Sequence, residues 1–150
     1  MTTDYEKWEK DCKRIKKEND KLLDEFYTYL LNHGIKSKTA KNHISNIDFY
    51  INEFLLYEDA IKAKDGIYNI DMFLGYWFIK KAMWSSPAHI KSNAASLKKF
   101  YTFIHEKGMV TEEDIKHLTS TIKNKMPEWI ATMERYEDPS ITDMADVWGL

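Results

Sequence analysis

The fold of this chain is decided by residues 85–108, which read SSPAHIKSNAASLKKFYTFIHEKG. Ser86 predicts a helix start, because its hydroxyl can accept hydrogen bonds from the unpaired amides of a first turn. Pro87 suits the first helical position, where no N–H is needed. Gly108 suits the residue after the last turn, where the backbone becomes left-handed. The stretch therefore predicts a helix between Pro87 and Gly108.

The apolar residues of this predicted helix recur at spacings of four and three, which places them on one stripe facing a core. They are Ile90, Ala94, Leu97, Tyr101 and Ile104. The residues expected to project away from the stripe are Lys91, Ser92, Ser96 and Lys99, with Lys98 on its flank. We therefore expect one side of the helix in a core and the other side facing an anion.

The composition bounds the class of protein. A chain of 150 residues with 43% hydrophobic and 14% aromatic content is long enough and apolar enough for one folded domain. Only five Gly and three Pro argue against a turn-rich all-β fold, and no period-two pattern is present. The single Cys12 cannot form an internal disulfide, and the N-terminus MTTDYEKWEK is too charged for a signal peptide. The apolar runs are too short to span a membrane. We expect a cytoplasmic protein that does not enter membranes.

The remaining periodicities predict an all-α fold, an orthogonal or antiparallel bundle of about five helices. Residues 1–21 predict a charged, exposed helical extension, and a firmer helix follows from about Asn19 to His33, ended by Gly34. Asn19 interrupts the apolar stripe of this region, which contains Trp8, Cys12, Ile15, Leu22, Phe26 and Leu30. A coiled-coil dimer through that stripe is an alternative.

A second helix is expected to start at Ser37 or Thr39, and it shares its plan with the helix after Ser86. Its apolar positions are Ala40, Ile44, Ile47, Ile51 and Phe54, again at four-three spacing. Its opposite side carries Lys38, Lys41, Asn42 and Ser45. We interpret the likeness as similar construction rather than as a repeat.

Loop signals fill residues 57–70, and Asn69 or Asp71 then predicts the cap of a short, largely buried helix to about Met83. Thr111, followed by three acids, predicts another helix start, and Pro127 is expected to end or kink that helix. The acidic tail predicts a short amphipathic turn that packs on the protein's own body or on a second copy. Its apolar residues are Ile141, Met144, Val147 and Trp148.

The charges are unevenly distributed, although the net charge is only −2. Residues 26–47 contain three lysines and no acid, and residues 72–105 contain five lysines and no acid. Two acid-free faces on neighbouring helices favour binding to DNA phosphates. The alternative is chance clustering on solvated helix faces.

No motif for a metal, a cofactor or catalysis is visible. The histidines are not in an HExxH or paired CxxC context, so we expect no metal site; they are His33, His43, His89, His105 and His117. The sequence lacks GxGxxG, Walker and GxSxG motifs, so we expect no cofactor. Cys12 has no obvious base beside it.

Three segments together resemble a known family. They are FYTYLLNHGIKSKTAKNHISNIDFYINEFL, FLGYWFIKK and SSPAHIKSNAASLKKFYTFIHEKG. This order is similar to the N-terminal core-binding domain of the tyrosine recombinases, the phage-integrase SAM-like domain, over residues 22–110. Residues 111–150 then form a C-terminal helix and acidic tail. The resemblance implies a role in DNA recombination or integration, in which the second and fourth helices form half of a clamp on duplex DNA.

Carried over residue by residue, the resemblance points to twelve DNA-binding candidates. They are Lys36, Lys38, Thr39, Lys41, Asn42, Ser45, Ser86, His89, Lys91, Ser92, Lys98 and Lys99. Lysines and hydroxyls suit phosphate contacts, which position a protein on DNA without reading its sequence.

The recombinase catalytic domain has no counterpart in the sequence. That domain supplies two arginines, a lysine, a histidine and a nucleophilic tyrosine, whereas Arg14 and Arg135 are the only arginines here and lie outside the matching segments. We therefore expect a non-catalytic DNA-binding protein, free-standing or part of something longer. A recombinase, or a second copy bound through the tail, is a further expected partner. The alternative is a helical protein–protein interaction module that kept the fold and lost DNA binding.

Overall fold

The computed structural model describes residues 3–149, and the helix expected after Ser86 is present as α5 (Pro87–Glu106). Ser86 Oγ accepts a hydrogen bond from the His89 amide at 3.2 Å, and Pro87 occupies the first turn. Gly108 adopts φ +77°, the left-handed conformation that a glycine reaches without strain. All regular structure in residues 3–149 is helical, so the predicted all-α class is confirmed.

The apolar stripe of α5 lies in the core as its spacing predicted. Its members Ile90, Ala94, Leu97, Tyr101 and Ile104 are each at most 2% exposed. Phe100 and Phe103 widen the buried side toward α1, where both rings contact Phe26. The outward placement of Ser96 was wrong, because its side chain is fully buried against α2.

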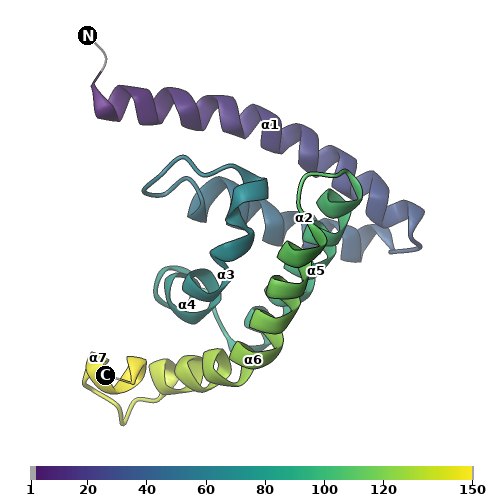
Figure 1. The fold of residues 1–150 in the computed structure, drawn as a ribbon. Helices are drawn as coiled ribbons and strands as arrows, with labels where there is room; N and C mark the ends of the chain where they lie inside the picture. The colour runs from purple at the N-terminus through teal and green to yellow at the C-terminus, as the bar shows by residue number, and fades with distance from the viewer. Residues whose placement is uncertain (1–2, 150) are drawn as a thin grey trace.

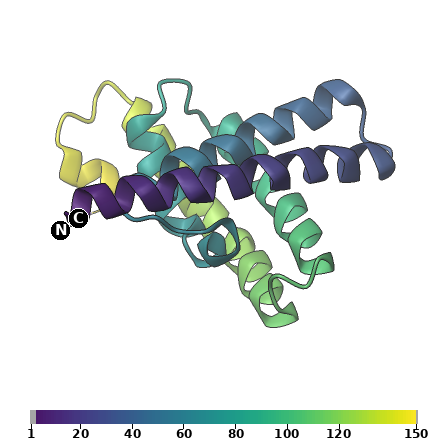
Figure 2. The ribbon, with the colours of Figure 1, turned by 90° about the horizontal axis from the view of Figure 1, so that it is seen from above.

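The first two helices form an antiparallel pair, which Figure 2 shows lying side by side. The first, α1 (Asp4–Asn32), is continuous, and Gly34 turns the chain with φ +81°. The second, α2 (Ser37–Asp48), continues into η1 (Phe49–Phe54), a π-helical segment. Ala40, Ile47 and Ile51 of its predicted stripe are fully buried.

Asn19 does not interrupt α1 as the sequence suggested. It is 1% exposed, and its amide donates to Ile51 O at 3.3 Å and to Asn52 Oδ1 at 2.8 Å. A buried amide with such partners avoids the free-energy cost of an unpaired donor. Asn19 therefore joins α1 to η1.

The N-terminal half of α1 rests on a small apolar cluster of its own. Cys12 and Ile15 pack against Leu56, with Trp8 and Ala60 at the edge. Charged residues cover the rest of this half, which passes over the segment after η1 (Figure 1). The expected division of the chain at residues 21 and 110 stays a prediction.

The segment expected to be a loop contains a short 3₁₀ helix, η2 (Ala63–Tyr68). Two buried tyrosines hold it: Tyr50 donates to Gly66 O at 2.6 Å, and Tyr101 donates to Ala63 O at 2.8 Å. A side chain at Gly66 would collide with the buried Leu55 side chain and force it to move, so close packing favours glycine here. Long-range hydrogen bonds impose this element, and local turn signals could not show them.

One helical run follows, made of α3 (Ile70–Met72), η3 (Phe73–Trp77) and α4 (Phe78–Lys81). Its inward side is fully buried, as expected for the most apolar segment. It ends at Lys81, where Ala82 becomes extended, rather than at Met83. The inward residues are Ile70, Phe73, Leu74, Phe78 and Ile79.

The C-terminal helix α6 (Glu112–Glu137) starts with the predicted cap and runs through Pro127. Thr111 Oγ accepts from the Asp114 amide at 3.1 Å, and Asp114 Oδ2 accepts from the Thr111 amide at 2.9 Å. The helix continues through Pro127 to Glu137, so this proline does not end it, and the axis of α6 bends along its course (Figure 1). Trp129, 1% exposed, anchors the later turns by donating to Asp71 Oδ1 at 2.7 Å.

The tail folds back as α7 (Met144–Trp148) onto the protein's own body. Val147 is fully buried, and the Trp148 ring lies 4.7 Å from that of Tyr76. Arg135 Nε donates to Val147 O at 2.9 Å. Val147 and Trp148 of the predicted tail set therefore pack within the chain, whereas Met144 is exposed, and contact of the tail with a recombinase or a second copy stays a prediction.

Among residues 3–149, no helix combines the length and the apolarity that crossing a bilayer requires.

The first testable prediction concerns the α5 stripe. Leu97→Ala should lower the free energy of unfolding by about 2–5 kcal/mol, because Leu97 is 1% exposed and its truncation leaves a cavity. Urea denaturation measures the change. Lys98→Ala, its exposed neighbour, should change stability by less than about 0.5 kcal/mol. An equally small effect at Leu97 would contradict burial of the stripe.

The second prediction concerns the tail. Deletion of residues 139–150 should lower the midpoint of thermal unfolding, because it uncovers Tyr76 and removes the acceptor of Arg135. Circular dichroism during heating measures the shift. Met144→Ala serves as control, since Met144 is 52% exposed and should matter little. An unchanged midpoint after the deletion would show that α7 contributes no packing.

Candidate nucleic-acid interface

The solvent side of α5 carries lysines, small residues and hydroxyls over most of its length. The sequence is acid-free from Pro87 to His105, and Glu106 is the first carboxylate. The exposed residues of α5 are Ala88, His89, Lys91, Ser92, Ala95, Lys98, Lys99, Thr102 and Glu106. This basic face of α5, defined by Lys91, Ser92, Lys98 and Lys99, is the direct consequence of burying the opposite stripe.

A polar junction fixes α2 beside this face. Its members are His43 and Asn46 on α2 and Ser92 and Ser96 on α5. His43 Nδ1 lies 2.7 Å from Ser96 Oγ, while the Asn46 amide donates to Ser96 Oγ at 2.9 Å and to Ser92 Oγ at 3.1 Å. The junction sets the position of α2 against α5, so it also sets how their outward faces are arranged.

The buried Ser96 hydroxyl is fully engaged in this junction. It lies 3.1 Å from Ser92 O, accepts from the Asn46 amide at 2.9 Å and lies 2.7 Å from His43 Nδ1. Its one hydrogen can be donated to Ser92 O or to His43 Nδ1, so both neutral tautomers of the ring fit this geometry.

The candidates on α2 separate into three groups around the helix, at about 100° per residue. Thr39 and Asn42 share the side of Asn46 and therefore lie toward α5. Lys38 points outward, and Ser45, seven residues later, lies between that side and a groove against α1, which it also lines. Lys41 lies on the far side, in a groove against α1 that Asp20 and Asp24 also line.

The candidates on α5 occupy two edges of its exposed side. Ser92 and Lys99, seven residues apart, lie on the edge next to α2. Lys91 and Lys98 lie about 100° away, on the other edge. Ser86 is committed to the cap, where its Oγ is also 2.8 Å from His89 Nδ1.

The six candidate lysines are free of ion pairs in the described part of the chain. Its salt bridges use Arg14, Lys62, Lys107 and Lys125. All six are exposed, namely Lys36, Lys38, Lys41, Lys91, Lys98 and Lys99.

A groove of about 390 Å³ lies between α5 and the end of α1. It is lined by Lys98, Lys99 and Thr102 of α5 and by Tyr29 and His33. Burial raises the pKa of Tyr29 to about 12, helped by Glu106, so its hydroxyl stays protonated.

Sequence reasoning missed His43, Asn46 and the buried role of Ser96. Two polar pairs carried a weak signal, His43 with Asn46 three residues apart and Ser92 with Ser96 four residues apart. Such spacings place two side chains on one helix face, but they do not say which helix lies opposite.

Residues 3–149 contain no cluster of three or more His, Cys, Asp or Glu side chains arranged to hold a metal ion. Comparison with known proteins gives no match: no family model, no curated protein and no solved structure matches this chain. What this surface binds must therefore be inferred from its own residues.

The third prediction concerns protonation of the junction. Burial of the His43 ring lowers its pKa below 6.5, and the positive charge of Lys99 lowers it further. The unfolded chain therefore binds more protons than the folded chain at pH values between the lowered pKa and about 6.5. Stability should fall as pH falls through that window.

Two measurements check the predicted pH dependence of stability. NMR titration of the His43 ring should give a midpoint below 6.5, and Lys99→Gln should raise it. His43→Gln should remove the corresponding part of the pH dependence of unfolding. A midpoint at or above the ordinary value would contradict the buried junction.

Proposed function

We propose that this protein binds duplex DNA without catalysis, through phosphate contacts from the outward faces of α2 and α5. One observation carries the proposal. In a chain of net charge −2, α5 presents three unpaired lysines on a side that is acid-free up to His105, and α2 flanks it with a further unpaired lysine, Lys38. Such a concentration of free cations attracts a polyanion despite the overall charge.

The small residues of α5 favour close approach. Ala88, Ser92 and Ala95 lie between the lysines on the exposed side, so a phosphate backbone can approach the helix. Thr39, Asn42 and Ser92 add uncharged donors near the junction. Contacts of this kind determine register and orientation on the duplex rather than sequence preference.

The resemblance to the core-binding domain of tyrosine recombinases supports this proposal, because it implies DNA contacts from the same two helices, α2 and α5. It extends the proposal to an accessory role in recombination or integration. The two arginines support the non-catalytic reading, because both have structural partners. Arg14 pairs with Asp11 at 3.2 Å, and Arg135 binds Val147 O and Thr132 Oγ1. Burial raises the pKa of the Cys12 thiol, which disfavours the nucleophilic thiolate.

The alternative is a protein-interaction module. Exposed apolar side chains in the short connection before α5 favour this alternative. Met83 is 99% exposed and Trp84 is 51% exposed, next to each other and on the surface. The acids that line the groove between α1 and α2 would repel DNA on that side. A protein partner would use these surfaces and leave the basic face of α5 free.

The fourth prediction tests DNA binding by fluorescence anisotropy with a labelled duplex of about 30 base pairs. The logarithm of affinity should fall with the logarithm of salt concentration at a slope of about −3 to −4.5, from roughly −0.9 for each of about three to five phosphates. Non-specific affinity should be roughly 10⁻⁴–10⁻⁶ M at physiological salt. Absence of salt-dependent binding at low salt would favour the protein-interaction module.

Charge-reversal variants locate the contact. Lys91→Glu with Lys98→Glu should abolish binding and leave the helical circular dichroism unchanged, since both side chains are exposed. The matched control is Lys10→Glu with Lys13→Glu, which makes the same charge change on the exposed part of α1. Equal loss in both double variants would show that only net charge matters and would refute a localised interface.

A further inference from the structure

A cavity of about 310 Å³ lies between the end of α2, the π-helical segment η1 and α5. Phe78 of α4 and Trp84 of the connection before α5 also line it. The residues that define the basic face of α5 do not line it, and its own lining contains two carboxylates and no basic side chain. We call it the acidic cavity. Its polar lining consists of Ser45, Asn46, Asp48, Glu53 and Asn93.

The side chain of Asn93 lies in the wall of the acidic cavity and keeps an unused acceptor. It is 3% exposed, and its Nδ2 donates to His89 O at 2.8 Å. A carbonyl oxygen only accepts, so this contact identifies the amide nitrogen and leaves Oδ1 without a donor among residues 3–149. The enclosed, unpaired side-chain atoms of those residues are Nε1 of Trp8 and Trp77, so Asn93 Oδ1 is open to the cavity. Buried carbonyl groups are normally paired, so this one favours a ligand with N–H donors.

The other polar groups of the acidic cavity are mostly acceptors as well. The amide nitrogen of Asn46 is used by the polar junction, which leaves its oxygen. Asp48 accepts from the Asn52 amide through Oδ1, which leaves Oδ2. The ion pairs of the described residues include neither Asp48 nor Glu53. The cavity therefore offers several acceptors and two unpaired negative charges to one ligand.

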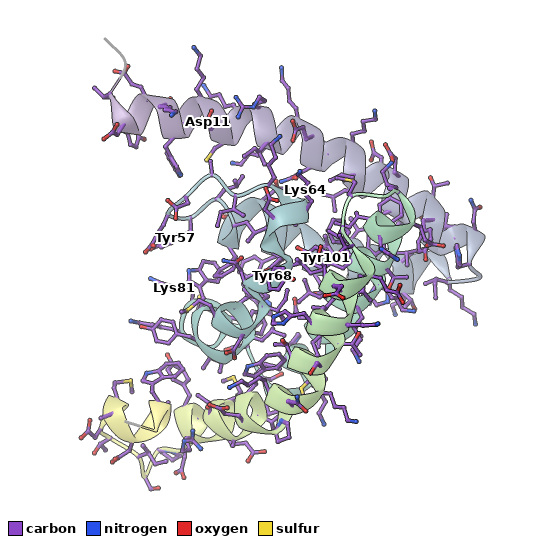
Figure 3. The ribbon with its side chains drawn as sticks, in the orientation of Figure 1. Asp11, Tyr57, Lys64, Tyr68, Lys81 and Tyr101 are labelled. Carbon is purple, nitrogen blue, oxygen red and sulfur yellow. The ribbon has the colours of Figure 1, made fainter. Side chains whose placement is uncertain are left out.

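The lysines of neighbouring segments are directed to other parts of the molecule. Lys81 Nζ lies 5.5 Å from the Tyr57 ring centroid, and Lys80 Nζ lies 5.5 Å from the Tyr76 ring centroid. Figure 3 shows Lys81 and Tyr57 on the same outer side of the molecule. Lys41 lines the separate groove against α1, where two further carboxylates accompany it. The negative charge of the acidic cavity is therefore not balanced by a lysine in its lining.

Trp84 gives the acidic cavity an open aromatic surface. Its side chain is 51% exposed. Its aromatic neighbour is Phe49, whose ring centroid lies 5.1 Å away at an interplanar angle of 67°. About half of the Trp84 surface is thus free, and the face of an indole attracts a cation electrostatically.

We propose that the acidic cavity binds a guanidinium group, which stacks on Trp84 and donates to Asp48, Glu53 and Asn93 Oδ1. A guanidinium is planar, always charged, and carries five N–H donors and no acceptor, which matches a cavity of acceptors and negative charge. An ammonium is a compact, strongly hydrated point charge with three donors, so it suits an indole face less well. The group can be carried by an arginine side chain of a protein or by a small guanidine. The inference does not depend on DNA binding.

The experiment uses the whole chain and follows two NMR signals, the Trp84 indole N–H and the Asn93 side-chain amide. They are assigned from Trp84→Phe and Asn93→Leu. N-acetyl-arginine methylamide should shift both signals in a saturable manner. The citrulline analogue lacks the charge and the lysine analogue lacks the planar fork, so both should bind more weakly. Equal binding of either analogue, or no shift from the arginine compound, would overturn the proposal.

Variants identify the groups responsible. Trp84→Leu, followed through the Asn93 amide, should weaken binding of the arginine compound by about 3- to 30-fold, the range expected for one cation–π contact. Glu53→Gln should also weaken it. Glu58→Gln is the matched control, because it makes the same change at an exposed carboxylate outside the acidic cavity and should leave the affinity unchanged. Unchanged affinity in both Trp84→Leu and Glu53→Gln would refute the assignment.

A peptide arm separates the two sources. Met83, next to Trp84, is 99% exposed, so apolar residues that flank an arginine would find a surface beside the acidic cavity. A short peptide with one arginine between leucines is compared with ethylguanidine. Tighter binding of the peptide would support an arginine side chain as the ligand, and binding of ethylguanidine at least as tight would support a small guanidine. Equal binding of the same peptide with lysine in place of arginine would contradict recognition of the guanidinium group.

Discussion

The structure depends on α5 keeping one side in the core and the other in solvent. Burial of its four-three stripe brings α2, α6 and the end of α1 together around one helix. The same burial places Tyr101 where it holds Ala63, while Tyr50 from η1 holds the nearby Gly66. Each of these buried hydroxyls is satisfied, because it donates to a backbone carbonyl of η2. The two hydrogen bonds hold this short helix in place.

The polar junction adds orientation to this packing. Apolar contact between two helices tolerates several crossing angles, but the buried Ser96 hydroxyl must reach both His43 and Asn46 of α2 as well as the carbonyl of Ser92. That requirement selects the arrangement in which Lys99 lies beside α2 and Lys41 lies on the α1 side near Asp20.

The sequence was most informative where the interactions are local. The Ser86 cap, the reciprocal cap of Thr111 and Asp114, and the left-handed glycines at 34 and 108 involve residues within four positions of one another. The buried stripe of α5 was also predictable, because helix geometry alone places residues four and three apart on one face. The same rule predicts that the lysines of α5 are exposed. These lysines are most of what α5 contributes to the candidate site.

The rest was decided by partners that are distant in sequence. Asn19 seemed to weaken α1 because its hydrogen-bond partners, Ile51 and Asn52, lie more than thirty residues away. Ser96 was assigned to solvent because periodicity cannot show that His43 and Asn46 would cover it. Pro127 was compatible with an ended or a kinked helix, but α6 continues through it, and Trp129 beyond it is buried and donates to Asp71, a residue far away in the sequence. Helix geometry fixes the direction of a side chain around its own axis, whereas only tertiary packing fixes what lies opposite it.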